Sequence, residues 1–381
     1  MTSEQLASKT ISSLRFPLTV IVVMAHFNFA NNNRGFGIHG VMYGKDQPDW
    51  FNWILNFFGT TLVEPGVPLF FMIAGYYFFY RKDFNFPIYK QKLKTRFHTL
   101  LIPYLLWNTL AILMVAIRFL PFFSDILPGM DKIQINLTWS GIFHTYFDNF
   151  HQEGIFIYPD SSPKTTVMPI DAPLWFVREL MAAVLLSPLL YWLIRKLKIY
   201  AILLWGIVAY FISPFVLFPS GGYIPMVLNT CLFFSWGAYY SINKLDIITE
   251  MRKLKIIPVI YVFFAIADTY MNGLCDFVHY ASTPFGAVTD FIFMSYLLEK
   301  GIVKENRFLS ESSFFVFAMH MVFMWELGKV VFVLFHLNNE PLVLLVFFFG
   351  NVTLTILICL ATYTLLKRYF PSVCNLLSGG R

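Results

Sequence analysis

Two ionisable residues in the first apolar run could do acid–base or charge-stabilising chemistry. Arg15 and His26 both lie in the run from about 11 to 30. Their spacing is about three turns of an α-helix, so both side chains leave nearly the same face, roughly 16 Å apart along the axis. An ionisable group inside a membrane span costs roughly 2.5–3.5 kcal/mol on insertion scales, so it indicates a partner or a function. Arg15 is also compatible with a snorkelling anchor and His26 with a polar helix contact, but one face that carries both favours a functional site.

Further polar residues interrupt other apolar runs. Glu64 lies in the segment 63–68, where two prolines and a glycine predict a broken helix. Its carboxylate could orient an imidazole or hold a proton, and pairing with Arg178 or hydration from outside are the alternatives. Arg178 is followed by Glu179, and because adjacent residues on a helix do not face each other, we expect a different partner for each. His320 lies in the middle of the run 313–336.

The densest basic stretch lies between 81 and 96 and holds six of the chain's 28 lysines and arginines. Such a run specifies a cytoplasmic loop and attracts anionic lipid. The alternative is a polyanionic ligand whose phosphates meet these side chains at the membrane face.

The composition identifies the surroundings of these residues. Hydrophobic residues make up 57% of the 381-residue chain and charged residues 13%, about half the usual charged share. A soluble fold of this composition would expose wide apolar surfaces. The composition argues against a disordered chain, a disulfide scaffold or a nucleic-acid partner, and the net charge of +6 is mostly a topology signal. The four cysteines lack metal-ligand spacing, so we expect no metal site.

The chain contains ten apolar runs, each long enough to form a membrane helix of about 20 residues. They lie near 11–30, 55–80, 99–120, 173–194, 200–218, 225–243, 256–275, 281–299, 313–336 and 342–366. With a cytoplasmic N-terminus, most basic residues fall in cytoplasmic loops. We therefore predict an all-α, polytopic integral membrane protein of about ten transmembrane helices with both termini in the cytoplasm. We expect a single domain over 1–381 without a fused soluble domain, and an outer loop at about 121–172 whose aromatic stretch predicts an interfacial or capping helix.

Five motifs occur in a familiar order. Arg15 and His26 form R-x10-H, residues 68–76 read PLFFMIAGY, Arg96 precedes IPYLLW at 102–107, residues 173–176 read PLWF, and SESSF at 310–314 leads to His320. Over about 10–325 the chain thereby resembles the membrane acyltransferase-3 family. The resemblance implies a ten-helix membrane enzyme that transfers an acyl group, commonly acetyl, from cytoplasmic acyl-CoA to a hydroxyl of an extracytoplasmic or lipid-linked glycan.

The resemblance also implies roles for individual residues. His26 would be the catalytic histidine, as base or acyl carrier, with Arg15 as its motif partner, and we add Glu64 as a possible third catalytic group. Arg96 would receive CoA phosphates. Where the family often has R-x-x-R, this chain has Arg96-Phe-His98-Thr, so Lys92, Lys94 or His98 would replace the second arginine. We expect further substrate contacts from the residues Trp175, Arg178 and His320.

These expectations place the protein in lipid, in a bacterial cytoplasmic membrane, with acyl-CoA and a glycan or lipid-linked sugar as substrates. A transporter or flippase of a lipid-linked or amphipathic substrate is the alternative, because broken helices and buried charges also occur in transporters. The sequence shows no two-fold repeat, which argues against that alternative.

Overall fold

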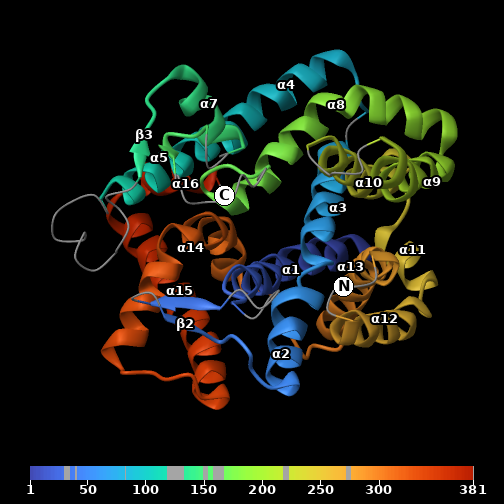
Figure 1. The fold of residues 1–381 in the computed structure, drawn as a ribbon. Coiled ribbons are helices and arrows are strands. Elements are labelled where there is room, and N and C mark those ends of the chain that lie inside the picture. Colours follow the sequence, from blue (N-terminus) through green and yellow to red (C-terminus); the bar gives the residue numbers. More distant parts are fainter. Residues whose placement is uncertain are drawn as a thin grey trace.

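The architecture is almost entirely helical (Figure 1). The computed structural model describes residues 1–29, 35–38, 41–81, 83–117, 133–148, 153–157, 167–217, 223–271 and 276–380. The helices of the first half are α1 (Ser3–His26), α2 (Asp49–Asn56), α3 (Gly66–Phe79), α4 (Phe86–Arg96), α5 (Ile102–Ile117), α7 (Trp139–Phe147) and α8 (Trp175–Leu197). Those of the second half are α9 (Ile199–Ile207), α10 (Tyr223–Ile242), α11 (Ile247–Lys253), α12 (Ile257–Met271), α13 (Asp276–Glu299), α14 (Arg307–Leu334), α15 (Pro341–Tyr369) and α16 (Pro371–Ser378).

Shorter elements join these helices. Within the described residues, three π-helical segments are η2 (Phe57–Thr61), η3 (Phe97–Leu101) and η6 (Val208–Leu217), and one 3-10 turn is η5 (Ala172–Leu174). Two small antiparallel pairs are formed by β1 (Phe36–Ile38) with β2 (Val41–Tyr43) and by β3 (Gln134–Ile135) with β4 (Phe156–Ile157).

The prediction of a multi-pass helical membrane protein is confirmed, but the number of ten spans is not. Each of the ten predicted runs falls largely on helix. In the described part of the chain, six helical segments are long and apolar enough to cross a membrane, or seven if the bent pair α11 and α12 forms one span. The count of ten and the cytoplasmic placement of both termini therefore stay predictions.

The predicted break around Glu64 is present. η2 ends at Thr61 and α3 begins at Gly66, so Glu64 lies in the turn between the two helical segments. Proline provides no backbone N–H, which explains why the helix stops at this point.

Helices α3 and α10 approach each other closely because glycines lie at their crossing. A Cβ atom on Gly75 would lie 1.9 Å from the carbonyl oxygen of Phe234, and one on Gly237 would lie 1.7 Å from that of Met72. Small residues permit such backbone contact between membrane helices.

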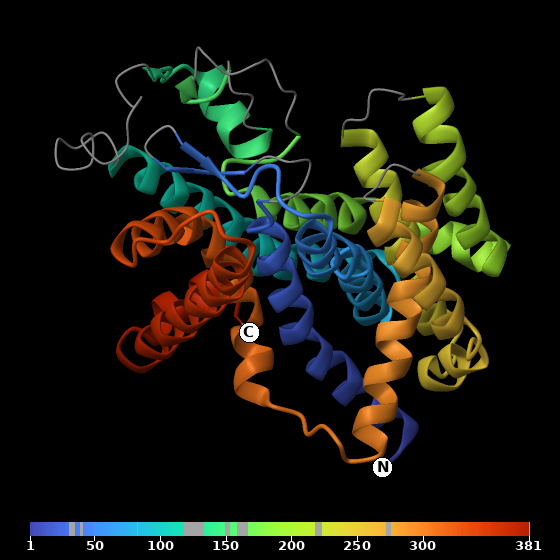
Figure 2. The same cartoon turned by 60° about the horizontal axis from the view of Figure 1, so that its bottom comes forward.

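Helix α1 runs through the middle of the molecule, between α3, α13 and α14 (Figure 2). Its buried side includes Ile11, Leu14, Leu18 and Val22. Polar contacts join it to α14, since Ser12 Oγ donates to Ser310 Oγ at 3.0 Å. α1 can therefore present one face to several helices at once.

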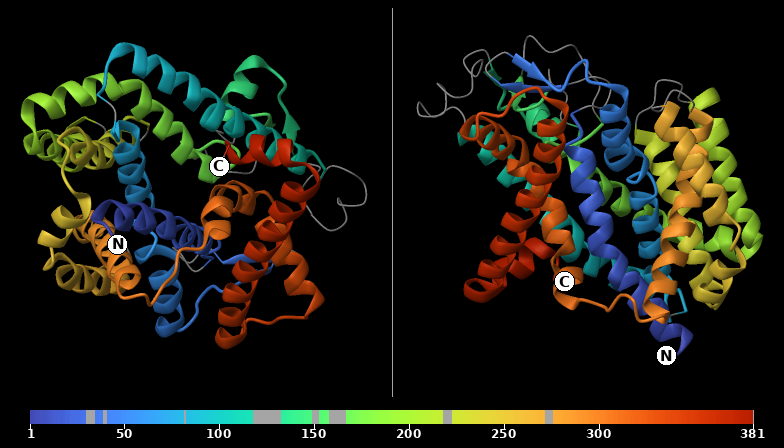
Figure 3. Two further views of the ribbon diagram at one scale, coloured as in Figure 1. Left: turned by 180° about the vertical axis from the view of Figure 1, so that it is seen from behind. Right: turned by 90° about the horizontal axis from the view of Figure 1, so that it is seen from below.

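The aromatic stretch of the long loop forms the predicted helix, α7, which lies at one end of the helical bundle (Figure 3). Tyr104 of α5 donates a hydrogen bond to the carbonyl of Tyr146, which anchors α7, whereas Trp139 at its start is 87% exposed. Residues 118–132, 149–152 and 158–166 of that loop lie outside the described residues.

Candidate functional site

Two arginines from separate motifs meet in one cavity. This inner cavity has a volume of about 280 Å³ and is lined by Arg15 and Thr19 of α1, Arg96 at the end of α4, and residues of α3, α8, α10 and α14. Neither Arg15 nor Arg96 has an ion-pair partner among the described residues, and the lining contains no acidic side chain. Most of the other lining residues are apolar or aromatic, so the inner cavity suits a ligand that has both an anionic and an apolar part.

Helix geometry brings the two arginines together. α4 ends at Arg96, and the chain continues through the wider turns of η3 into α5. On α1, one turn beyond Arg15, the hydroxyl of Thr19 donates to the Arg15 carbonyl at 3.0 Å. Thr19 and Ser313 of α14 both line the inner cavity, so its polar atoms continue along α1 and α14 in the direction of His26.

A pair of histidines lies farther along α1 and α14 than Thr19 and Ser313. The rings of His26 on α1 and His320 on α14 are 5.1 Å apart between centroids and make an edge-to-face contact. His26 is partly buried, and His320 is fully buried. The structure thus brings together two of the predicted site residues from opposite ends of the sequence.

Backbone hydrogen bonds orient both rings in the same way. Nδ1 of His26 lies 2.8 Å from the carbonyl oxygen of Val22, and Nδ1 of His320 lies 3.2 Å from that of Val316. Because a carbonyl can only accept, both Nδ1 atoms carry the proton. A neutral ring then has its lone pair on Nε2, and Nε2 of His320 is buried without a hydrogen-bond partner. Each ring is therefore held as a tautomer whose Nε2 can act as a base.

Phe317 borders both the inner cavity and the histidine pair. Its side chain lines the cavity, and its ring centroid lies 6.3 Å from that of His320. Phe317 therefore connects the lining of the inner cavity to the histidine pair.

Glu64 lies against the imidazole of His279. Its Oε1 is 3.3 Å from Nε2 of His279 on α13, and Nδ1 of the same ring is 3.1 Å from Oδ1 of Asp268 on α12. Thr61 donates to the other oxygen of Asp268 at 3.2 Å. The sequence left open which imidazole Glu64 could orient, and the one it contacts is that of His279, because the break before α3 turns its carboxylate toward α12 and α13. A catalytic role for Glu64 stays a prediction.

The expectation of separate partners for Arg178 and Glu179 is wrong. Nε and Nη2 of Arg178 donate to Glu179 Oε1 at 3.0 and 2.6 Å. The long guanidinium side chain curves back over the first turn of α8, where its Nη1 also donates to the carbonyl of Phe147. The alternative pairing of Glu64 with Arg178 is not the arrangement found. Arg178 thus ties α7 to α8, and it does not line the inner cavity.

Trp175, at the start of α8, also lies outside the lining of the inner cavity. Its ring is 6.4 Å from that of Phe71 between centroids, and the next residue, Phe176, is the one that lines the cavity. A direct substrate contact by Trp175 or Arg178 therefore stays a prediction.

The basic stretch contributes one side chain to the inner cavity. That side chain is Arg96. Lys92 donates to the carbonyl of Phe78, and its Nζ lies 4.7 Å from the centroid of the Phe78 ring. Lys94 and His98 are exposed and do not line the cavity. Of these four residues only Arg96 lines the inner cavity, and the phosphate contacts of all four stay predictions.

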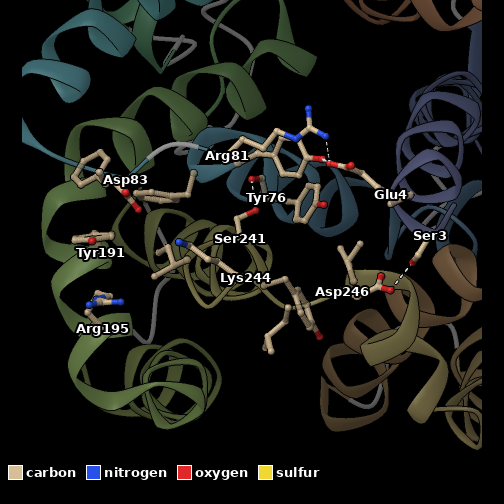
Figure 4. A pocket seen from close by; sticks show the side chains of 18 residues that line it. Ser3, Glu4, Tyr76, Arg81, Asp83, Tyr191, Arg195, Ser241, Lys244 and Asp246 are labelled. Atoms are coloured by element: carbon tan, nitrogen blue, oxygen red, sulfur yellow. Dashed lines mark hydrogen bonds and ion pairs between the residues drawn. The ribbon is translucent and has the colours of Figure 1, made fainter.

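A larger cavity, here called the terminal cavity, lies beside the N-terminus of α1. Its volume is about 960 Å³, and Figure 4 shows the residues that line it at the ends of α3, α8 and α10. Arg81, Arg195 and Lys244 provide basic groups, and Glu4, Asp83 and Asp246 provide acidic ones. The sequence grouped these basic residues only by their predicted side of the membrane.

Sequence reasoning missed His279 and the terminal cavity. Asp268 was visible as a carboxylate that interrupts an apolar run, and His279 lies just before the next run. That pairing of an acid and a histidine across a short helical connection was the available signal.

The described fold and these cavities define a helical membrane protein with an arginine-lined cavity beside a histidine pair. A family model described as an acyltransferase domain matches residues 9–360, so the chain belongs to this acyltransferase family. The resemblance seen in the five motifs is thereby confirmed, and membership makes the protein a membrane-embedded transferase of acyl groups.

A curated relative covers most of the chain. The succinoglycan biosynthesis protein ExoH of Rhizobium meliloti (strain 1021) is 27% identical over 350 residues, which are 87% of this chain and 83% of ExoH. No solved structure matches the chain.

Proposed function

We propose that the protein transfers an acyl group, most simply acetyl, from cytoplasmic acyl-CoA to a hydroxyl of an extracytoplasmic or lipid-linked glycan. The observation that carries the proposal is the inner cavity, where Arg15 and Arg96 meet without an acidic neighbour. An apolar cavity with two unpaired cations suits the acyl-bearing end of a thioester donor, because cations stabilise the negative charge that develops on the thioester oxygen during transfer. The name of ExoH, which refers to succinoglycan biosynthesis, supports a glycan as the acceptor.

The proposed chemistry uses His26 as the base. Nε2 of His26 takes the proton of the acceptor hydroxyl while the hydroxyl oxygen attacks the thioester carbonyl. The new C–O bond replaces the C–S bond, and CoA leaves as a thiolate that takes up a proton. In the alternative route, Nε2 attacks the thioester first, and the acyl group passes from His26 to the acceptor.

This proposal places the N-terminal end of α1 on the cytoplasmic side of ten spans. Arg15 then lies nearer the cytoplasm than His26, so a donor that enters past the arginines would extend toward the histidines. The outer side, with α7, would face the glycan. The host membrane would be the bacterial cytoplasmic membrane.

The experiment uses the full-length protein in vesicles with acetyl-CoA and membrane-extracted glycan precursors, and follows the mass of the glycan. The wild-type protein should add one acyl group per modified hydroxyl only when acetyl-CoA is present. His26→Asn should abolish the addition, whereas His336→Asn, at the exposed end of α14, should retain it. Full acylation by an inserted His26→Asn protein would refute the role of His26, and glycan movement without acyl-CoA would favour the transporter alternative.

A further inference from the structure

Three neighbouring cavities share lining residues from α1, α3 and the chain just after α3. Tyr77 lines both the inner cavity and a small connecting cavity of about 250 Å³. Glu4, Tyr80 and Arg81 line both the connecting cavity and the terminal cavity. The three cavities therefore share walls in series, from the side of the N-terminus to Arg15.

The charges of the terminal cavity divide into paired and unpaired groups. Arg81 and Tyr80 both donate to Oε1 of Glu4. Asp246 accepts from Ser3 Oγ at 2.5 Å and, outside the cavity lining, from Thr249 and the backbone of α11. Although burial acts to raise the pKa of Asp246, these hydrogen bonds lower it overall, so its carboxylate is both ionised and satisfied.

Two cations remain without an ion-pair partner in the part of the chain that the structure describes, Arg195 and Lys244. In Figure 4 they lie on the same side of the cavity, near Tyr191. The exposed Asp83 lines the same cavity. A ligand with phosphate groups would meet two unneutralised cations, and Asp83 would accept from a ligand hydroxyl or amine.

A second lysine with a similar backbone φ provides a control for Lys244. Lys244 follows α10 with φ of 55°, a left-handed conformation that favours glycine. The next residue, Leu245, closes the helix end by donating to the carbonyl of Tyr240 at 2.8 Å. Lys198 after α8 has a similar φ of 51°, but it does not line the cavity, so it provides a matched control.

The volumes of the inner cavity and the terminal cavity indicate different roles. Binding pockets for cofactor-sized molecules typically measure about 300–1,000 Å³, so the inner cavity of about 280 Å³ is small for a whole nucleotide-bearing donor. The terminal cavity, at about 960 Å³, has the necessary size.

We propose that the terminal cavity binds the phosphorylated nucleotide end of the acyl donor, with Arg195 and Lys244 contacting its phosphates. The arm that carries the acyl group then passes through the connecting cavity into the inner cavity. This inference rests on the proposed function, because it takes the donor to be an acyl-CoA.

The experiment measures equilibrium binding of coenzyme A and of pantetheine, which lacks the nucleotide, to the full-length protein in lipid-free detergent. The wild-type protein should bind coenzyme A more tightly than pantetheine. Arg195→Gln combined with Lys244→Gln should weaken coenzyme A binding by about tenfold, because charge-assisted contacts to phosphate are lost. Pantetheine binding should not change.

The control combines Arg368→Gln and Lys198→Gln, which remove two exposed cations at the ends of α15 and α8. This variant should bind both ligands as the wild type does. An unchanged affinity of the cavity variant for coenzyme A, or an equal loss for both ligands, would overturn the inference. Phosphatidylglycerol binding is measured separately, and a loss confined to this lipid would also overturn the inference, because it would identify a lipid phosphate as the occupant. If the wild type binds neither ligand, the proposed function itself fails.

Discussion

Two regions of the molecule hold a histidine between helices, and they hold it in opposite ways. His26 and His320 donate through Nδ1 to carbonyls of their own helices and have no acidic partner among the described residues. His279 lies between two carboxylates, Glu64 and Asp268. Since an ionised carboxylate can only accept, the flanked ring holds protons on both nitrogens when both carboxylates are ionised.

The difference teaches what each region can do. A ring whose Nδ1 is held by the backbone keeps Nε2 available to a reactant, as a base requires. A ring held at both nitrogens is committed to its neighbours, and it joins the break before α3 to α12 and α13. We therefore propose that the histidine pair takes part in the chemistry and that the Glu64–His279–Asp268 cluster holds the helices together.

The largest expected effect contrasts His26→Asn with His279→Asn. Loss of a positioned general base lowers turnover by about 10²–10⁴-fold, so His26→Asn should reduce transfer by at least about 100-fold. His279→Asn should leave the transfer rate per folded protein within about tenfold of the wild type, since it removes no base. Steady-state acyl transfer, normalised to correctly folded protein, checks both.

Glu64→Gln refines that contrast. If Glu64 serves the cluster, its loss should resemble His279→Asn. A loss of transfer as large as that of His26→Asn would instead establish the predicted catalytic role of Glu64 and end the division between the two regions.

The next largest expected effect is a change in the free energy of unfolding when the Glu64–His279–Asp268 cluster loses a member. Removing one member of a buried ion pair costs about 3–5 kcal/mol, so Asp268→Ala, whose carboxylate is 2% exposed, should lower the free energy of unfolding by roughly 3 kcal/mol. Chemical unfolding in a mild detergent measures the change. Asp268→Asn should recover part of it by accepting from Nδ1, and the exposed Asp83→Ala serves as the control. Equal stability of Asp268→Ala and the wild type would show that the cluster is not cohesive.

His320→Phe tests the region of the His26–His320 pair, and its expected effect is smaller. The substitution keeps an aromatic ring but removes the buried Nε2 that has no partner. Leaving a buried polar atom unsatisfied costs about 1–3 kcal/mol, so His320→Phe should stabilise the protein by about 1 kcal/mol while transfer falls by about tenfold. Thermal unfolding and turnover are measured on the same sample. Full activity in the more stable variant would reduce His320 to a packing residue.

The smallest expected effect concerns Asp171, a buried carboxyl group outside both histidine regions. Burial raises the pKa of Asp171, before α8, well above its ordinary value. In the unfolded chain the Asp171 carboxyl group ionises near pH 4. Between that pH and the higher pKa of the folded state, the carboxyl group is ionised in the unfolded chain but still protonated in the folded protein. Folding stability therefore decreases as pH rises through this window. Asp171→Asn should stabilise the protein at neutral pH and lose this advantage below about pH 4, which thermal unfolding at both pH values can check.

Much of the site could be predicted because it depends on distances within one helix. The spacing of Arg15 and His26 fixes their common face on α1, and the prolines around Glu64 fix the break before α3. The family followed from short motifs that need no tertiary information. The aromatic stretch at 139–147 likewise predicted α7, because local periodicity specifies a helix.

Contacts between helices could not be read in this way. The sequence determined a helical membrane protein of the acyltransferase family and the positions of its ionisable residues, since composition and spacing act along the chain. Only the tertiary structure decided that His320 meets His26, that Glu64 meets His279, and that Arg96 rather than Lys94 or His98 reaches the cavity of Arg15. The physical reason is that a long side chain can turn toward any of several neighbouring helices, and the packing of those helices, set by contacts such as Gly75 against Phe234, selects one.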